Sequence, residues 1–297
     1  LGYCVVREEI RTKLENICTR IGETNDIAQL QLLEAINEWE QNYDEGEETR
    51  KRSAKLIKML EKNLELDGVK EILERKDYLI KRSNWIFGGD GWAYDIGYGG
   101  LDHVMSTGND VNVMVFDTEV YSNTGGQASK STPRAAIAKF AAAGKSGRKK
   151  DLGKMIMSYG NVYVAQIAIG ANPSQALKAI REAEAYHGPS LIIGYAPCVN
   201  HGIKGGMEKT QSHEKKAVES GYWNLYRYNP SLKEQGKNPF QLDSGEPKIP
   251  FKDFLMSEVR YMSLMQRDPE LAEELFRQAQ EDAHNRFEEY KRLSLSL

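Results

Sequence analysis

Hydrophobic residues recur with two different periods along this chain. In the first 83 residues, apolar side chains are spaced three and four positions apart, and Leu14, Ile17 and Cys18 show this spacing clearly. Such spacing places side chains on one face of a helix. The pattern predicts several amphipathic helices over residues 1–83, with the charged residues on their solvated faces.

After residue 84, short apolar runs alternate with stretches of helical pattern. Repeated strand–helix–strand units with apolar strands indicate a parallel sheet that helices cover on both faces. We therefore predict an α/β fold, a doubly wound parallel sheet with helical flanking segments. The predicted strands are 85–88, 111–116, 161–170 and 190–197, and the helices among them are 93–106, 133–144 and 173–187.

The rest of the chain is more mixed. A loop is expected over 144–153, which is basic, and a loop or hairpin over 229–250, which is rich in proline and glycine. The other expected elements are helices over 211–220, 251–265 and 269–293 and a strand over 222–228. We expect three segments, namely 1–83 as a helical extension of the same domain, 84–228 as the α/β core, and 229–297 as a loop with C-terminal helices packing on that core.

The first predicted strand ends in a glycine turn, Gly89-Asp90-Gly91. Glycine has no side chain, so the backbone can turn sharply here and approach a ligand closely. The helical pattern that follows would present its N-terminus to that ligand, and helix N-termini bind phosphate groups. The turn therefore predicts a diphosphate site.

The second predicted strand ends in a polar loop, Asp117 to Asn123. Parallel sheets bind ligands at the carboxyl ends of their strands, so we expect Asp90 and this loop to lie side by side. A carboxylate, a hydroxyl, an amide and backbone carbonyls together suit a hard cation. Mg²⁺ is usually held by a few such oxygens together with substrate phosphates.

Two longer stretches carry a family resemblance, GDGWAYDIGYGGLDHV from Gly89 and DTEVYSNTGGQ from Asp117. With these motifs, residues 84–248 resemble the C-terminal thiamine diphosphate-binding domain of the pyruvate:ferredoxin (flavodoxin) oxidoreductases, or pyruvate synthases. The resemblance implies thiamine diphosphate and Mg²⁺ as cofactors of the core over 84–228.

The resemblance also assigns roles to individual residues. Mg²⁺ would be bound by Asp90, by the side chain of Thr118 and by the backbone carbonyl of Val120. Asn123 would face the diphosphate and the substrate end of thiamine as the catalytic residue of this chain. The complete set of implied cofactor contacts is Gly89, Asp90, Gly91, Thr118, Val120 and Asn123.

Cys198 lies in the stretch APCVNHG, residues 196–202. By spacing alone, an isolated cysteine is a small buried hydrophobic residue. The resemblance assigns it one thiolate of a [4Fe–4S] cluster, which needs four, and the others would lie upstream of residue 1. This chain alone is therefore expected to hold no stable cluster. Cys4 and Cys18 are expected to be core residues of helices.

The implied parent enzyme converts pyruvate and coenzyme A into acetyl-CoA and CO₂, and passes electrons through iron–sulfur clusters to ferredoxin or flavodoxin. The family is dimeric, which implies a homodimer, and N-terminal domains of the same enzyme are the implied partners. One of them carries the glutamate that activates the aminopyrimidine. Since the first residue is Leu1, we expect a fragment of a longer protein. Without the activating glutamate, this fragment is expected to have no turnover of its own.

The composition of the chain bears on its possible partners and on its compartment. A net charge of −3 over 297 residues favours neither nucleic acid nor a membrane surface as partner. No apolar run approaches the roughly 18 residues of a spanning helix. Three widely spaced cysteines imply no disulfide framework, and a reducing cytoplasm is expected. Two other functions stay open: a thiamine-dependent oxidoreductase for another keto acid, and a non-catalytic assembly module of the same fold.

Overall fold

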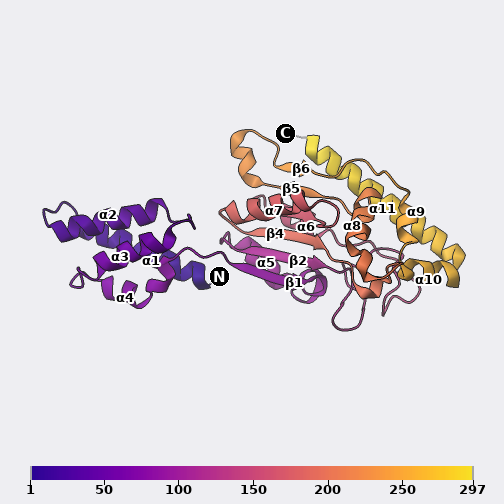
Figure 1. The fold of residues 1–297 in the computed structure, drawn as a ribbon, viewed down its shortest axis with the longest axis horizontal. Coiled ribbons are helices and arrows are strands. Elements are labelled where there is room, and N and C mark those ends of the chain that lie inside the picture. Colours follow the sequence, from indigo (N-terminus) through magenta and orange to yellow (C-terminus); the bar gives the residue numbers. More distant parts are fainter. Residues whose placement is uncertain (1, 296–297) are drawn as a thin grey trace. The chain divides into compact units, whose positions relative to one another are not determined.

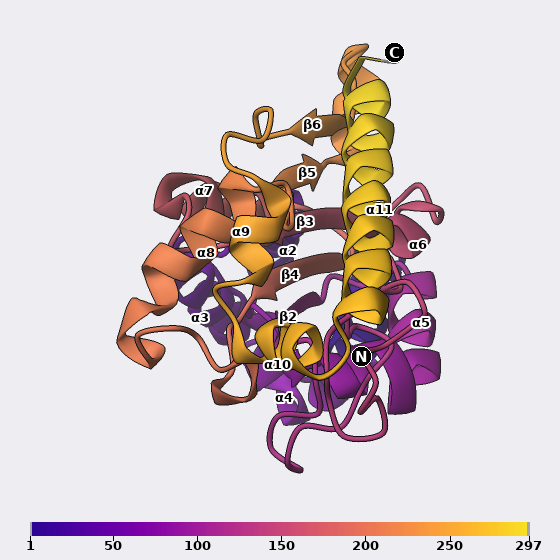
Figure 2. The same ribbon diagram turned by 90° about the vertical axis from the view of Figure 1, so that its right-hand side faces the viewer.

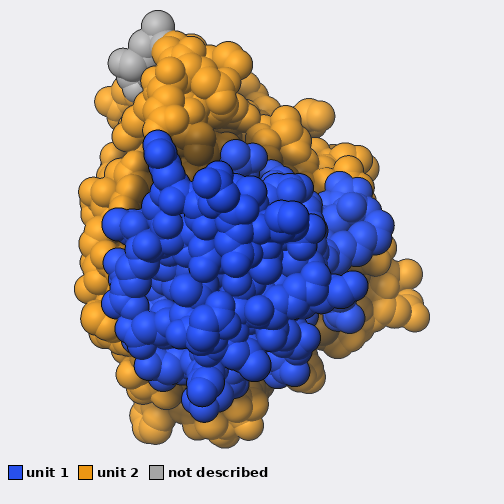
Figure 3. Space-filling model, turned by 90° about the vertical axis from the view of Figure 1, so that its left-hand side faces the viewer, with its two compact units in different colours: residues 1–84 blue, residues 85–297 orange. Residues whose placement is uncertain are grey.

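The computed structural model describes residues 2–295, and the chain divides into two compact units between Asn84 and Trp85 (Figures 1 and 3). The first unit is helical, as its sequence period predicts. Its helices are α1 (Gly2–Ile21), α2 (Ile27–Gln41), α3 (Thr49–Leu60) and α4 (Val69–Glu74), followed by a 3₁₀ turn (Lys76–Leu79).

The first unit has a hydrophobic core of its own. The side chains that fill it come from every helix of the unit, and the Trp39 indole donates a hydrogen bond to the Leu79 carbonyl at 2.9 Å. The fully buried members include Leu14, Leu32, Ile36, Leu56, Leu60, Val69 and Ile72. These are the positions at which the apolar spacing of residues 1–83 recurs.

The second unit is built on a six-stranded sheet with the order β1-β2-β4-β3-β5-β6. The strands are β1 (Trp85–Gly89), β2 (Asn112–Asp117), β3 (Tyr163–Ile167), β4 (Ser190–Tyr195), β5 (Tyr226–Tyr228) and β6 (Phe240–Leu242). The first four are parallel, as predicted, whereas β5 and β6 extend the sheet in antiparallel fashion. Apolar strands β2, β3 and β4 are almost wholly buried because they lie inside this sheet.

Helices cover both faces of the sheet (Figure 2). One face carries α5 (Tyr98–Ser106), α6 (Leu152–Met157) and the long α11 (Pro269–Leu295). The other carries α7 (Pro173–Ala185) and α8 (Thr210–Glu219). The short α9 (Phe251–Leu255) contacts α11, and α10 (Val259–Arg267) leads into α11. No helix among the described residues is long and apolar enough to cross a membrane.

The helix predicted over 133–144 is absent, and this prediction was wrong. The segment is irregular, and Ala135 and Phe140 have positive φ angles of 71° and 67°, which a right-handed helix excludes. Its N–H groups bind distant carbonyls instead, as Ala135 does with Lys145 at 2.8 Å and Lys139 with Gly126 at 2.9 Å. Tertiary hydrogen bonds thus override the helix propensity of an alanine-rich stretch.

Other boundaries also differ from the predictions. The helix expected over 93–106 begins as a π-helical turn (Gly91–Ile96) and continues as α5. The loop expected over 144–153 runs into α6, which was not predicted, and the helix expected over 251–265 is divided into α9 and α10.

Candidate functional site

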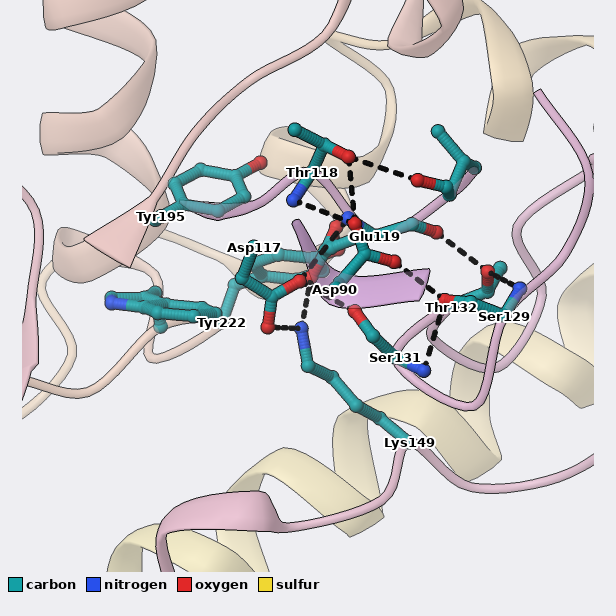
Figure 4. A network of polar contacts seen from close by, with 12 residues as sticks. Asp90, Asp117, Thr118, Glu119, Ser129, Ser131, Thr132, Lys149, Tyr195 and Tyr222 are labelled. Carbon is teal, nitrogen blue, oxygen red and sulfur yellow. Dashed lines mark hydrogen bonds and ion pairs between the residues drawn. The ribbon is translucent and has the colours of Figure 1, made fainter. Parts of the chain in front are cut away.

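Asp90 and Thr118 meet at the carboxyl ends of two adjacent strands. β1 and β2 are parallel neighbours with Gly89 opposite Phe116, so the residues that follow them emerge together. The carboxylate oxygen Oδ1 of Asp90 accepts hydrogen bonds from the Thr118 hydroxyl at 2.7 Å and the Thr118 N–H at 3.2 Å (Figure 4). The expected juxtaposition of the glycine turn and the polar loop is confirmed.

Three oxygens converge at this point. The Thr118 hydroxyl lies 2.7 Å from Asp90 Oδ1 and 2.9 Å from the Val120 carbonyl oxygen. A hydroxyl has one proton, so it cannot donate to both acceptors at once. A cation shared by the three oxygens would satisfy all of them, and the donor set of carboxylate, hydroxyl and carbonyl fits Mg²⁺. Their assignment as metal ligands stays a prediction.

The environment of Asp90 disfavours its negative charge. Burial, and secondly the nearby carboxylate of Asp117, raise the pKa of Asp90 to about 6, although hydrogen bonds from Ser129 and Thr118 act in the opposite direction. The Ser129 hydroxyl donates to the second carboxylate oxygen of Asp90 at 2.7 Å. A bound divalent cation would offset the unfavourable charge, so this carboxylate is suited to metal binding.

The two glycines of the turn have different surroundings. A Cβ on Gly89 would meet no atom within 4 Å, so the backbone there faces open space that a ligand could enter. A Cβ on Gly91 would lie only 2.3 Å from the Tyr121 ring. The close approach at Gly91 is therefore made by a side chain of the same unit, which the sequence did not indicate.

Asn123 lies in a tight loop that starts from the three converging oxygens. Hydrogen bonds from Tyr121 N–H to the Gln127 carbonyl at 2.9 Å, and from Gly126 N–H to the Tyr121 carbonyl at 2.8 Å, close this loop. The Asn123 side chain is exposed. Its place at the substrate end of a cofactor stays a prediction.

Cys198 lies beside the same loop, because β4 is the other neighbour of β2. Its buried sulfur is 2.7 Å from the Ser122 hydroxyl and accepts from the Asn200 side chain at 3.3 Å. Cys4 and Cys18 both lie on α1, where the helical rise separates them by about 21 Å. With three cysteines so arranged, this chain does not fit a [4Fe–4S] cluster, which needs four thiolates.

Beneath the three oxygens lies a network of buried charges that the sequence did not predict. Lys149 Nζ bridges Asp117 at 2.8 Å and Glu119 at 2.9 Å (Figure 4). Glu119 also accepts from Arg260 and from the Tyr222 hydroxyl, each at 2.6 Å. Burial alone would raise the pKa of Glu119, but Lys149 and Arg260 outweigh it and lower the pKa to about 2.

These residues come from four separate parts of the second unit. Lys149 lies in a segment predicted as a basic loop, and Arg260 belongs to α10, 141 residues after Glu119. One feature of the sequence could have indicated this network. An acidic residue, Glu119, stands directly between the predicted metal ligands Thr118 and Val120. Nothing in the spacing of Lys149 or Arg260 indicated which carboxylate either would contact.

His201 provides a further contact to the site. Its Nε2 lies 2.7 Å from the Thr118 carbonyl oxygen, which can only accept, so this nitrogen carries the proton. The Nδ1 of the same ring is 3.5 Å from the buried Glu258, which also contacts His213 at 2.6 Å. His201 belongs to the APCVNHG stretch, and it fixes the backbone of Thr118 from the β4 side.

Comparison with known proteins places these features in a family. Residues 71–193 match the family described as thiamine pyrophosphate enzyme, C-terminal TPP binding domain. A pyruvate-flavodoxin oxidoreductase of Klebsiella pneumoniae is 58% identical over 267 residues, which is 89% of this chain and 23% of the relative.

Two further relatives carry related names. A pyruvate-flavodoxin oxidoreductase of Enterobacter agglomerans is 53% identical over 307 residues, 100% of this chain and 25% of the relative. A pyruvate:ferredoxin oxidoreductase of Moorella thermoacetica is 62% identical over 228 residues, 77% of this chain and 19% of the relative. The chain thus spans a quarter or less of the length of these relatives.

Proposed function

This chain belongs to the thiamine pyrophosphate enzymes, in the group of pyruvate-flavodoxin and pyruvate:ferredoxin oxidoreductases, and on that premise we propose that it holds the Mg²⁺–diphosphate end of thiamine diphosphate. The reaction proposed for the parent enzyme is the oxidation of pyruvate with coenzyme A to acetyl-CoA and CO₂. One proton and two electrons are released, and the electrons pass singly to flavodoxin or ferredoxin.

The main support for this proposal is that Asp90 Oδ1 and Val120 O both lie within hydrogen-bonding distance of the Thr118 hydroxyl oxygen. Three protein oxygens leave room in an octahedral shell for diphosphate oxygens and water. The open backbone at Gly89 would let the diphosphate approach the same edge of the sheet.

When bound, thiamine diphosphate would supply the carbanion that adds to the keto carbon and the ring that accepts electrons after CO₂ is lost. The residues of this chain would anchor and orient it. In our proposal Asp90, Thr118 and Val120 fix the metal, and the Asn123 amide contacts the diphosphate and the substrate side. We also propose that residues 84–228 bind the cofactor and that residues 229–297 pack on this α/β core.

The remaining properties concern the parent protein. We propose a cytoplasmic homodimer in which N-terminal domains complete the active site. Cys198 would supply one thiolate to a [4Fe–4S] cluster whose other ligands lie outside this chain. Preference for pyruvate over another keto acid is proposed from the names of the relatives, and keto-acid kinetics of the parent enzyme would test it.

A calorimetric titration tests the proposal on this chain. Thiamine diphosphate should bind in the presence of Mg²⁺ and not in EDTA, and Asp90→Ala should abolish binding. Asp102→Ala is the matched control, because the half-buried Asp102 carboxylate accepts a hydrogen bond from Tyr159 and contacts none of the converging oxygens. Equal binding by the two variants, or binding that ignores Mg²⁺, would refute the proposed site.

A further inference from the structure

Glu119 has an unusual backbone conformation for its residue type. Its φ angle is 57°, in the left-handed region that side chains other than glycine rarely adopt. It stands between Thr118 and Val120, the two loop residues with converging oxygens. Strained backbone of this kind persists where surrounding contacts enforce it, and it concentrates at functional sites.

The conformation of Glu119 determines how its neighbours point. In an extended strand the chain would carry Val120 away from Asp90. The left-handed residue instead turns the backbone, and the Val120 carbonyl oxygen comes within 2.9 Å of the Thr118 hydroxyl. The Thr118 hydroxyl, which contacts the Asp90 carboxylate at 2.7 Å, is thereby also in contact with the Val120 carbonyl oxygen.

The side chain of Glu119 is held from three directions. Lys149 contacts one carboxylate oxygen at 2.9 Å, whereas Arg260 and the Tyr222 hydroxyl contact the other, each at 2.6 Å. Both carboxylate oxygens of Glu119 are thus engaged by groups other than the converging oxygens, and Figure 4 shows two of these groups, Lys149 and Tyr222. Glu119 therefore cannot compete with diphosphate as a metal ligand.

The backbone of Glu119 is held as well. Its N–H donates to the Asp117 carboxylate at 3.1 Å, and its carbonyl accepts from the Thr132 hydroxyl at 2.5 Å. The preceding carbonyl, that of Thr118, is bound by His201. The peptide groups on both sides of the strained residue are thus fixed by buried partners.

We propose that Glu119 is a positioning residue, whose carboxylate, anchored by Lys149 and Arg260, holds the left-handed turn that aligns the Thr118 and Val120 oxygens with Asp90 for cation binding. This inference rests on the proposed function and extends it to a residue that touches neither metal nor cofactor. The ligand class is a divalent cation carrying a diphosphate.

One substitution removes the Glu119 carboxylate and still leaves Lys149 and Arg260 paired with other carboxylates. Glu119→Gly deletes the carboxylate, while glycine still permits a positive φ. Lys149 keeps its contact with Asp117 at 2.8 Å, and Arg260 keeps Glu258 at 2.6 Å. Glu119→Gln, which retains an acceptor for Tyr222, carries the same test should the glycine variant fail to fold.

A matched control is a buried ion pair elsewhere in the unit. Arg227 on β5 contacts Glu182 at 2.7 Å and Asp243 at 2.8 Å, and neither belongs to the site. Arg227→Leu should lower the melting temperature while the Mg²⁺ concentration for half-saturation changes by less than about twofold.

The measurement is the Mg²⁺ concentration that half-saturates thiamine diphosphate binding by the 297-residue chain, together with the melting temperature. Loss of such an outer contact to metal ligands should raise that concentration about 10-fold or more in Glu119→Gly. Unchanged Mg²⁺ dependence in a folded Glu119 variant would overturn the inference and leave the proposed function standing. So would an equal effect of Arg227→Leu, which would mark a loss of general stability. Absence of Mg²⁺-dependent binding by the unsubstituted chain would overturn both.

Discussion

The ring of Tyr121 occupies the space that a side chain at position 91 would need, with a ring carbon 2.3 Å from where a Gly91 Cβ would stand. This relationship ties the glycine turn after β1 to the loop after β2. It holds the two halves of the candidate site together by packing, in addition to the hydrogen bonds between Asp90 and Thr118.

Gly91→Ala should therefore destabilise the chain. The added methyl overlaps the Tyr121 ring, and overpacking of this kind costs about 1–3 kcal/mol in the free energy of unfolding. Gly99→Ala is the control, since a Cβ at this helical position meets nothing within 4 Å. It should stabilise by about 0.5–1 kcal/mol because alanine favours helix. Urea unfolding of both variants checks the contrast, and equal effects would contradict it.

The buried carboxyl of Asp90 predicts a pH dependence. Its pKa is raised from 3.8 to about 6, so the folded chain binds this proton more tightly than the unfolded chain. Without a cation, this group's contribution should make stability fall as the pH rises from about 4 to about 6. Asp90→Asn should then be more stable than the original chain at pH 8, by about 1–3 kcal/mol, with no such advantage below pH 4.

Unfolding midpoints of the two proteins in EDTA across this pH range check the prediction. A constant difference at every pH would show that titration of Asp90 is not its cause.

Lys149 should matter more for stability than its place in a basic loop indicates. Its side chain is 16% exposed and separates two buried carboxylates, Asp117 and Glu119. Lys149→Met leaves these charges facing each other, and removal of one partner from a buried pair costs about 3–5 kcal/mol. Lys130→Met is the control, because Lys130 is exposed and its pair with Asp95 contributes at most about 1 kcal/mol. Chemical denaturation at pH 7 measures both, and similar losses would disprove the role of Lys149.

Iron analysis tests the cysteine arrangement. Cys198 lies beside the candidate site, and its sulfur already contacts Ser122. After anaerobic reconstitution with iron and sulfide, this chain should retain no stoichiometric [4Fe–4S] cluster. A stable cluster that is lost in Cys198→Ser would show that the chain can supply or recruit the remaining ligands itself.

The sequence predicts the part of the site that local patterns encode. Apolar runs followed by Gly89 and by Asp117 define two strand ends, and parallel pairing brings them to one edge, so Asp90 and Thr118 could be placed together. The charge network could not be predicted in this way. Arg260 approaches Glu119 only because α10 packs near the loop that follows β2, and the spacing of residues in the sequence does not predict that contact.

The stretch 133–144 shows that tertiary contacts also override local patterns in secondary structure. Its alanines favour a helix locally, yet Ala135 adopts a φ of 71° and binds the Lys145 carbonyl. The antiparallel pair β5 and β6 matches the hairpin that was one of the two expectations for 229–250. The pairing of β5 with β3 was not predicted, because it depends on the chain returning to the β3 edge.

In the proposed site, three oxygens, from Asp90, Thr118 and Val120, bind the metal that carries the diphosphate. The most direct test is a crystal structure of this chain with thiamine diphosphate and Mn²⁺, in which anomalous scattering locates the metal. We predict a single metal about 2.0–2.3 Å from Asp90 Oδ1, Thr118 Oγ1 and Val120 O. A metal and diphosphate bound away from these oxygens would refute the proposed site.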